Sequence, residues 1–324
     1  MMPDATMQFL GNMDLFWLLM SLAGGAFGAM IGANYAFGFT GVTILLGLGV
    51  LAGTGNSIIL DYVSFGPVFG PHIAFAGGVA AAAYAGRKKV LVGGGKDVNS
   101  PLAGLNRPDV LLVGALFGAG GYLVERLIKL IPWLGSHTDT VALTVVISAL
   151  VARVIFGRTS IFHRLTPPAE GARWLDWQEQ PKQLLTVSLF ASTLAAGASM
   201  VVGSYILPLS VADEHWARML DNAHVLPFAI SAVCIFFVAG GLRMPVTHHM
   251  TITASLAAIA FLKISGSGMV GLLAGIVFGV IAGFVGELMA RLMYSHGDTH
   301  IDPPAAAIWV MNTLVAVAAM PFLD

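Results

Sequence analysis

Histidines stand at the starts of strongly apolar stretches, where they could carry proton or ion chemistry. His72 follows Pro71 at one such start, and His248 and His249 follow Thr247 at another. An imidazole titrates near neutral pH, so it can relay protons or bind a metal ion. Hydrocarbon penalises an unpaired polar group, which favours a functional role, although a capped helix entrance would also explain these residues. We expect all three histidines to lie on a substrate or ion path.

Two His-x-Asp pairs stand at the starts of further apolar stretches. His137 and Asp139 form the first pair, and His300 and Asp302 form the second. Asp302 precedes Pro303, as an N-cap residue precedes a first-turn proline, so helix capping explains the aspartates without a substrate. Capping does not explain the histidines two residues earlier. We therefore expect both pairs to act as vestibule or gate residues.

Three acidic residues complete the candidates for the substrate or ion path. Glu125 and Glu287 lie within apolar stretches, and each is followed four residues later by a cation, Lys129 or Arg291. This order allows an ion pair on one helix face. Each glutamate is therefore either self-paired near the membrane surface or a carboxylate for a coupling ion. Asp61 lies in a linker and has no neighbouring cation in the sequence.

The composition places these residues in a membrane protein. Only 10% of the 324 residues are charged and 57% are hydrophobic, whereas an ordinary soluble domain has about 25% charged residues. A soluble protein of this size needs polar cover, which excludes a soluble enzyme and a disordered chain. The net charge of −1 gives no basic footprint for nucleic acid. The single cysteine, Cys234, excludes a disulfide framework.

The apolar stretches predict an all-α, polytopic protein with about ten membrane segments. A bilayer core about 30 Å thick needs roughly 20 apolar residues per helical crossing. The first 14 residues contain no Lys or Arg, so they lack the basic region of a cleaved secretory signal. The segments are expected at 14–37, 40–55, 72–86, 109–132, 138–157, 183–207, 227–241, 248–264, 268–293 and 303–322.

Lysine and arginine residues set the expected orientation, because loops rich in them face the cytoplasm. If the ten segments alternate, 12 of the 16 Lys and Arg residues fall on one side and 4 on the other. We therefore expect loops 87–108 and 158–182 to be cytoplasmic and both termini to lie outside. The prediction is a multi-pass protein of the plasma (inner) membrane.

The chain consists of two similar halves. Residues 111–118 resemble residues 272–279, Ser136–Thr140 resembles Ser295–Thr299, and the candidate His and Glu residues recur in the same order. Five segments per half is an odd number, so the halves would have opposite orientations. Inverted repeats place a transporter's substrate site near the midplane at the repeat interface. The expected parts of this one membrane domain are a first repeat (1–160), a cytoplasmic linker (161–182) and a second repeat (183–324).

Segments two, three, seven and eight are unusually short. They hold about 15–16 residues each, or roughly 24 Å at 1.5 Å per residue. Short segments at matching positions of two repeats point to a transporter binding site. They are either tilted crossings or re-entrant half-helix hairpins. In the hairpin version His72 and His249 would lie near the midplane, and otherwise they would lie at opposite surfaces.

Together these patterns favour a secondary active transporter (permease) that moves a small polar solute or cation and is coupled to protons. Two alternatives stay open: a passive channel for a small solute or ion, and an intramembrane metal-dependent enzyme. An enzyme would gather its His and acidic residues on one face, whereas the symmetry distributes them, so we expect no enzymatic activity. No motif specifies a cofactor, although His and Asp leave a bound metal ion open.

Glycines at four-residue intervals predict close helix packing. Such ladders run through Gly24–Gly32 and Gly271–Gly283, and they serve either internal packing or a homodimer. The expected partners are therefore the lipid bilayer, a small-molecule or ion substrate and a second copy of the chain, with no nucleic acid.

Overall fold

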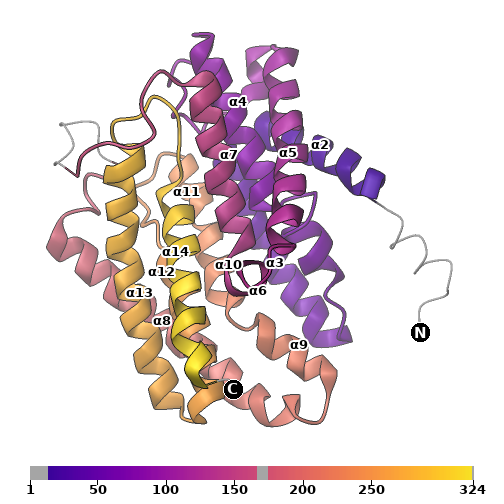
Figure 1. Cartoon of the computed structure of the whole chain (residues 1–324), viewed down its shortest axis with the longest axis vertical. Coiled ribbons are helices and arrows are strands. Elements are labelled where there is room, and N and C mark those ends of the chain that lie inside the picture. Colours follow the sequence, from indigo (N-terminus) through magenta and orange to yellow (C-terminus); the bar gives the residue numbers. More distant parts are fainter. Residues whose placement is uncertain (1–13, 166–173, 323–324) are drawn as a thin grey trace.

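The computed structural model describes residues 14–165 and 174–322, and every regular element in these two ranges is a helix (Figure 1). The single strand-like pairing within them is an isolated bridge between Gly95 and Thr299. The predicted all-α fold is thus confirmed. Residues 166–173 of the predicted linker and the two chain ends, 1–13 and 323–324, lie outside the described residues.

Five described helices are long and apolar enough to cross a membrane. A sixth span would result if α9 (Glu214–Asn222) and the helical stretch Val225–Ala239 cross together, with a bend of 45° between them. Two shorter apolar helices are α2 (Asp14–Ile31) and α7 (Thr140–Phe156). The structure therefore shows a helical membrane protein. The five are α3 (Ala33–Thr54), α5 (Pro108–Lys129), α8 (Pro181–Ser210), α13 (Gly268–Met289) with the π-helical turn η4 (Ala290–Tyr294), and α14 (Pro303–Ala319) with the 3₁₀ turn η5 (Met320–Phe322).

The boundary between the first two segments differs from the prediction. α2 ends at Ile31 because Gly32 has a φ of +93°, a conformation that favours glycine. α3 then starts at Ala33, so the expected short segment 40–55 is part of a 22-residue helix about 33 Å long. Gly38 does not break α3, because its missing side chain makes room for the ring of Phe236. This segment is a full-length helix rather than a half-helix.

The other three short segments differ from one another. The third is a π-helical turn, η2 (Pro71–Phe75), followed by α4 (Ala76–Arg87). The seventh, 227–241, is broken into α10 (Val225–Val233) and α11 (Ile235–Ala239), and α9 precedes it. The eighth is one continuous helix, α12 (His248–Ser265). The predicted short segments therefore have similar lengths in the sequence but different helical structures.

The two halves of the chain pack their helices in the same pattern. In the first half α2 packs against α4 and α5, and in the second α8 packs against α12 and α13. Likewise, α7 packs on α4 and α5, and α14 packs on α12 and α13. Figure 1 shows most of the first half (indigo to magenta) on one side and most of the second half (orange to yellow) on the other.

Helices α7 and α14, which hold equivalent positions in the halves, pack together and run in opposite directions. Arg153 near the end of α7 donates a hydrogen bond to Thr299, just before α14. Asp139, just before α7, accepts one from Asn312 in the second half of α14. The start of each helix thus lies beside the later part of its partner.

α3 and the broken helical stretch α9–α11 also run in opposite directions. Phe39, near the start of α3, contacts Phe236 in α11 edge to face. At the other end, the His215 ring in α9 bonds to the carbonyl oxygen of Leu51 near the end of α3. α3 therefore runs antiparallel to the stretch α9–α11.

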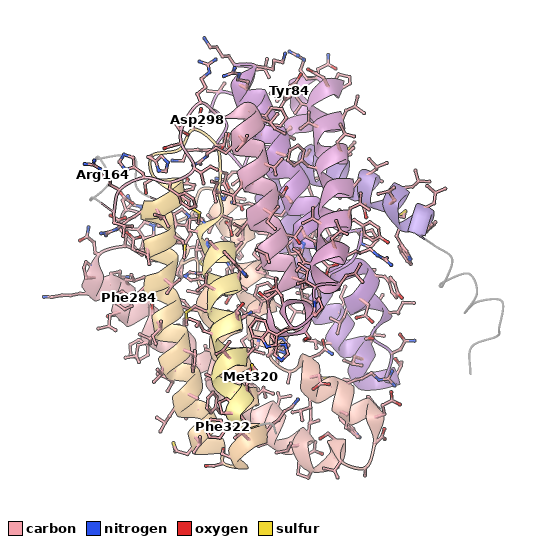
Figure 2. The ribbon with its side chains drawn as sticks, in the orientation of Figure 1. Tyr84, Arg164, Phe284, Asp298, Met320 and Phe322 are labelled. Carbon is pink, nitrogen blue, oxygen red and sulfur yellow. The ribbon has the colours of Figure 1, made fainter. Side chains whose placement is uncertain are left out.

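The cation-rich loops gather at one end of the helices. Figure 2 shows Tyr84, Arg164 and Asp298 at one end, and Met320 and Phe322 at the other. Between these ends, large apolar side chains point outward. Leu116 on α5 and Leu194 on α8 are 66% and 76% exposed, which suits contact with lipid chains.

Both glycine ladders are used inside the protein. A Cβ on Gly28 would meet the carbonyl oxygen of Ala74 in η2, and a Cβ on Gly279 would meet Ser192 in α8. Small residues let these helix backbones approach closely. A homodimer would therefore need a different surface.

Candidate functional site

A cavity of about 380 Å³ lies where the two halves meet. The first half contributes walls from α3, η2 and the start of α7, and the second contributes walls from α10–α12 and the start of α14. The volume falls in the range of small-molecule pockets, which makes this cavity the candidate site. Its titratable lining residues are Asp139, His224, His248, His300 and Asp302.

Asp302 is fixed at the start of α14. Its Oδ2 accepts a hydrogen bond from the backbone N–H of Ala305 at 2.8 Å, as an N-cap does. Its Oδ1 lies 3.2 Å from Nε2 of His300. His248 of α12 is close enough to interact electrostatically with this carboxylate. The structure thus places the predicted gate pair His300 and Asp302 close to His248, a histidine predicted for the substrate or ion path.

Asp139 has the same capping role at the start of α7. Its Oδ1 accepts from the backbone N–H of Ala142 at 2.8 Å, and its Oδ2 accepts from Nδ2 of Asn312 at 3.0 Å. The Asn312 carbonyl oxygen accepts in turn from the hydroxyl of Thr253 on α12 at 3.0 Å. Sequence reasoning missed Asn312. A lone amide within an apolar membrane segment is the signal that would have found it.

Aromatic rings form another part of the cavity wall. The Phe37 ring lies 5.9 Å from the rings of both Phe75 and Phe228, each edge to face. The His248 ring lies 4.8 Å from Phe37, and the His300 ring lies 6.0 Å from Phe75. Sequence reasoning missed the three phenylalanines because an aromatic residue in an apolar stretch carries no distinctive signal.

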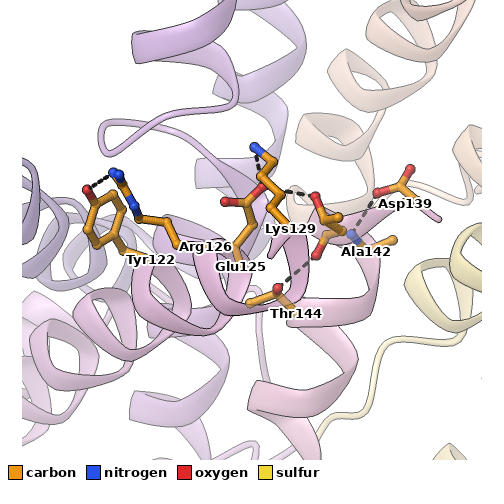
Figure 3. Close-up of polar contacts among 8 residues, drawn as sticks. Tyr122, Glu125, Arg126, Lys129, Asp139, Ala142 and Thr144 are labelled. Carbon is orange, nitrogen blue, oxygen red and sulfur yellow. Dashed lines mark hydrogen bonds and ion pairs between the residues drawn. The ribbon is translucent and has the colours of Figure 1, made fainter. Parts of the chain in front are cut away.

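Glu125 lies behind the cavity wall. Its Oε1 accepts a hydrogen bond from the lining residue Thr140 at 2.9 Å and pairs with Lys129 Nζ at 2.5 Å (Figure 3). His72 is buried within electrostatic range of Glu125 and Lys129 but does not line the cavity. The self-paired arrangement foreseen for this glutamate is therefore present, and Glu125 reaches the cavity through Thr140.

The second-half counterparts also lie outside the cavity. Glu287 pairs with Arg291 at 2.6 Å and interacts with the buried Glu179, a residue that sequence reasoning missed. The His249 ring is fully buried and packs on Gly286, where an added Cβ would lie 2.7 Å from Nε2. Within the described residues, neither of its ring nitrogens has a hydrogen-bond partner.

Two further candidates lie at the periphery. His137 stacks on Trp133 with ring centroids 5.1 Å apart and bonds to the Trp133 carbonyl oxygen. Asp61 is exposed and accepts a hydrogen bond from the Ser57 hydroxyl. Neither residue lines the cavity, so the structure separates His137 from its partner Asp139.

A buried arginine ties the loop before α14 to the end of α7. Arg153 is 1% exposed and donates to the hydroxyl and the carbonyl oxygen of Thr299 and to the carbonyl oxygen of Met293, at 2.5–2.8 Å. Gly297 is required beside it, because a Cβ there would lie 2.0 Å from a guanidinium nitrogen. This loop therefore has one defined position.

Three residues make a chain of contacts that runs outward from the cavity wall. The His300 ring, which lines the cavity, lies 5.2 Å from the Tyr294 ring. Lys96 Nζ lies 4.0 Å from the centre of the Tyr294 ring and 3.3 Å from the Ser295 carbonyl oxygen. Sequence reasoning treated Lys96 only as an orientation signal. The structure places Lys96 against Tyr294, which in turn contacts the cavity-lining His300.

Lys96 should give the protein a measurable pH dependence. Partial burial and the nearby Arg153 lower the pKa of Lys96 to about 8, against the opposing effect of Asp298. The unfolded chain then binds more protons than the folded one between about pH 8 and the ordinary lysine pKa of about 10.4, so stability should rise with pH there.

Thermal unfolding in detergent at pH 7.0 and 9.5 measures this effect. The thermal midpoint of the wild type minus that of Lys96→Met should be larger at pH 9.5 than at pH 7.0. Lys88→Met, which removes an exposed lysine of the same loop, is the control and should keep the wild-type pH response. Parallel responses of all three proteins would contradict the assignment.

The fold and the cavity define a helical membrane protein with an internal small-molecule-sized site. The chain belongs to a family of unknown function, DUF7973, whose family model matches residues 7–166 and 168–322. Comparison with curated proteins and with solved structures gave no match. Within residues 14–165 and 174–322, no three His, Cys, Asp or Glu side chains are grouped to hold a metal ion.

Proposed function

We propose that the protein is a secondary active transporter that moves a small polar solute or cation in exchange with protons. The observation that carries this proposal is the cavity between the halves, lined by Asp139 and Asp302 at equivalent capping positions. A site at the interface of two inverted repeats is the arrangement of many secondary transporters.

The inverted-repeat architecture is part of the proposal. It is supported by the matching helix contacts of the halves and by the antiparallel course of α7 and α14. The two family matches meet within the predicted linker 161–182. In the proposed topology the Lys- and Arg-containing loops 87–108 and 158–182 face the cytoplasm, both termini lie outside and the membrane is the plasma (inner) membrane.

Proton coupling is assigned to Asp302. The titratable groups around this carboxylate are His300 on the same segment, His248 and His249 on α12, and Tyr294 in η4. A carboxylate next to imidazoles can take up and release a proton as a substrate leaves and enters. The proposed proton site thus shifts from His72 and His249 to the cavity wall.

We take the contacts beside the cavity as support for a transporter over a passive channel. His300, Tyr294 and Lys96 are in contact in that order, and Arg153 bonds to Thr299, next to His300, and to Met293, next to Tyr294. A passive pore needs a continuous open path, whereas alternating access needs a substrate site closed on one side at a time.

Uptake into proteoliposomes tests the proposal. A panel of small amines, guanidinium compounds, amino acids and sugars is offered across an imposed pH gradient. At least one solute class should accumulate, and a protonophore should abolish the accumulation. Uptake that occurs but ignores every ion gradient would support the passive channel, and no uptake at all would reject transport.

A further inference from the structure

We infer that the cavity binds a small organic cation that carries N–H donors, of the alkylammonium or alkylguanidinium class. The inference deepens the proposed transport function by naming the substrate class of the same cavity, and it rests on that function only for the claim that the ligand is moved.

The charges that face the cavity favour a cation. Of the described lining residues, Asp139 and Asp302 are acidic and none is Lys or Arg. The starts of α7 and α14 would otherwise attract an anion. Each of them is already capped by its own aspartate at 2.8 Å, so an anion would have to displace a carboxylate.

The hydrogen-bonding groups of the cavity favour a donor ligand. An ionised Asp302 only accepts, so His300 donates to it through Nε2, and a neutral His300 ring then keeps Nδ1 as an acceptor. This atom has no hydrogen-bond partner in the described chain, and His300 is only 5% exposed. Nδ1 of His248, which is equally buried and also lines the cavity, has none either. A buried polar atom without a partner is costly. A ligand N–H would satisfy Nδ1 of a neutral His300, and it would satisfy Nδ1 of His248 in the tautomer that leaves this atom without a hydrogen.

The aromatic walls favour an organic rather than an inorganic cation. The rings of Phe37, Phe75 and Phe228 line the cavity and meet edge to face, and aromatic faces attract ammonium and guanidinium groups. An inorganic ion would need a shell of oxygen ligands. The described residues hold no His, Cys, Asp or Glu cluster suited to a metal ion.

Calorimetric titration of the full chain in lipid nanodiscs tests the inference. The cationic probes are butylammonium and propylguanidinium. The neutral counterparts of similar shape are butan-1-ol and propylurea, and butyrate is the anion. At least one cation should bind saturably and at least about tenfold more tightly than its neutral counterpart, with no binding of butyrate. Neutral probes that bind as tightly as the cations, or the absence of saturable cation binding, would overturn it.

Two variants connect the binding to the named groups. Asp302→Asn should weaken cation binding by at least about tenfold, because a charge-assisted hydrogen bond is lost. Phe37→Leu should weaken it about two- to tenfold, the range of a partly desolvated cation–π contact. Glu214→Gln, which removes an 82% exposed carboxylate outside the cavity, should bind like the wild type. Equal losses in all three variants would contradict a site in the cavity.

Binding and transport can fail separately. Cation binding without gradient-driven uptake of the cation would reject the transporter and keep the ligand class. Gradient-driven uptake of another solute, without cation binding, would keep the transporter and reject the ligand class.

Discussion

Replacing Asp302 with asparagine should abolish proton-driven uptake. Asn caps a helix start about as well as Asp, so the hydrogen bond to the Ala305 N–H and the position of α14 should be kept. The amide cannot exchange a proton, and it cannot pair with His300 as a charge. The bound cation would also lose its buried charged partner, at a free-energy cost that corresponds to roughly thirtyfold or more. We therefore expect the initial uptake rate of propylguanidinium into proteoliposomes with an acidic lumen to fall by at least that factor.

The matched control is Asp213→Asn. Asp213 also caps a helix, α9, by accepting from the N–H of His215 at 2.8 Å, but it is exposed and lies outside the cavity. It should transport at the wild-type rate. The thermal midpoints of both variants should stay close to that of the wild type. Normal proton-driven uptake by Asp302→Asn would reject the assigned proton site, whereas a folding defect in that variant would show as a lowered midpoint.

Replacing Gly121 with alanine should be the most destabilising of the small substitutions in α5. An added Cβ would lie 1.8 Å from the carbonyl oxygen of His72. This oxygen belongs to the backbone of η2 and cannot rotate away, so α5 and η2 would have to separate. Overpacking of this kind costs roughly 1–3 kcal/mol and occasionally more. We expect a value of about 3 kcal/mol, seen as a thermal midpoint lowered by about 5 °C or more.

Gly120→Ala separates this contact from the general effect of alanine in a helix. Gly120 is the preceding residue of α5, and nothing lies within 4 Å of a Cβ placed there. Alanine is favoured over glycine in a helix by about 0.5–1 kcal/mol, so this variant should be slightly more stable than the wild type. Equal midpoints for the two alanine variants would show that the contact between Gly121 and His72 is not tight.

Much of the fold could be predicted because its cause lies in single residues and their neighbours. Apolar stretches are helical in lipid, since each backbone polar group must be paired within the segment. Caps and i, i+4 pairs are also local, so the capping contacts of Asp139 and Asp302 and the ion pair Glu125–Lys129 could be foreseen from the sequence. The α2–α3 boundary was misplaced because many glycines follow one another there, and the sequence does not say which one has positive φ.

The composition of the cavity wall was far less predictable. His72 and His249 had the same sequence signals as His248 and His300, yet only the latter pair lines the cavity. A change of one residue turns a helix side chain by about 100°, so His248 and His249 face different neighbours. No sequence signal fixes that rotation when the whole segment is apolar.

By itself, the sequence determined that the chain is a helical membrane protein with a small set of polar residues, because scarce charges and long apolar stretches have one stable solution in lipid. Only the tertiary structure decided which polar residues meet. The antiparallel packing of α7 and α14 brings Asp139 and Asp302 to one cavity and Asn312 to Asp139. The loop after α4 brings Lys96 to Tyr294 in η4. These are contacts between residues far apart in the chain, and they depend on how helices rotate and cross when their surfaces pack.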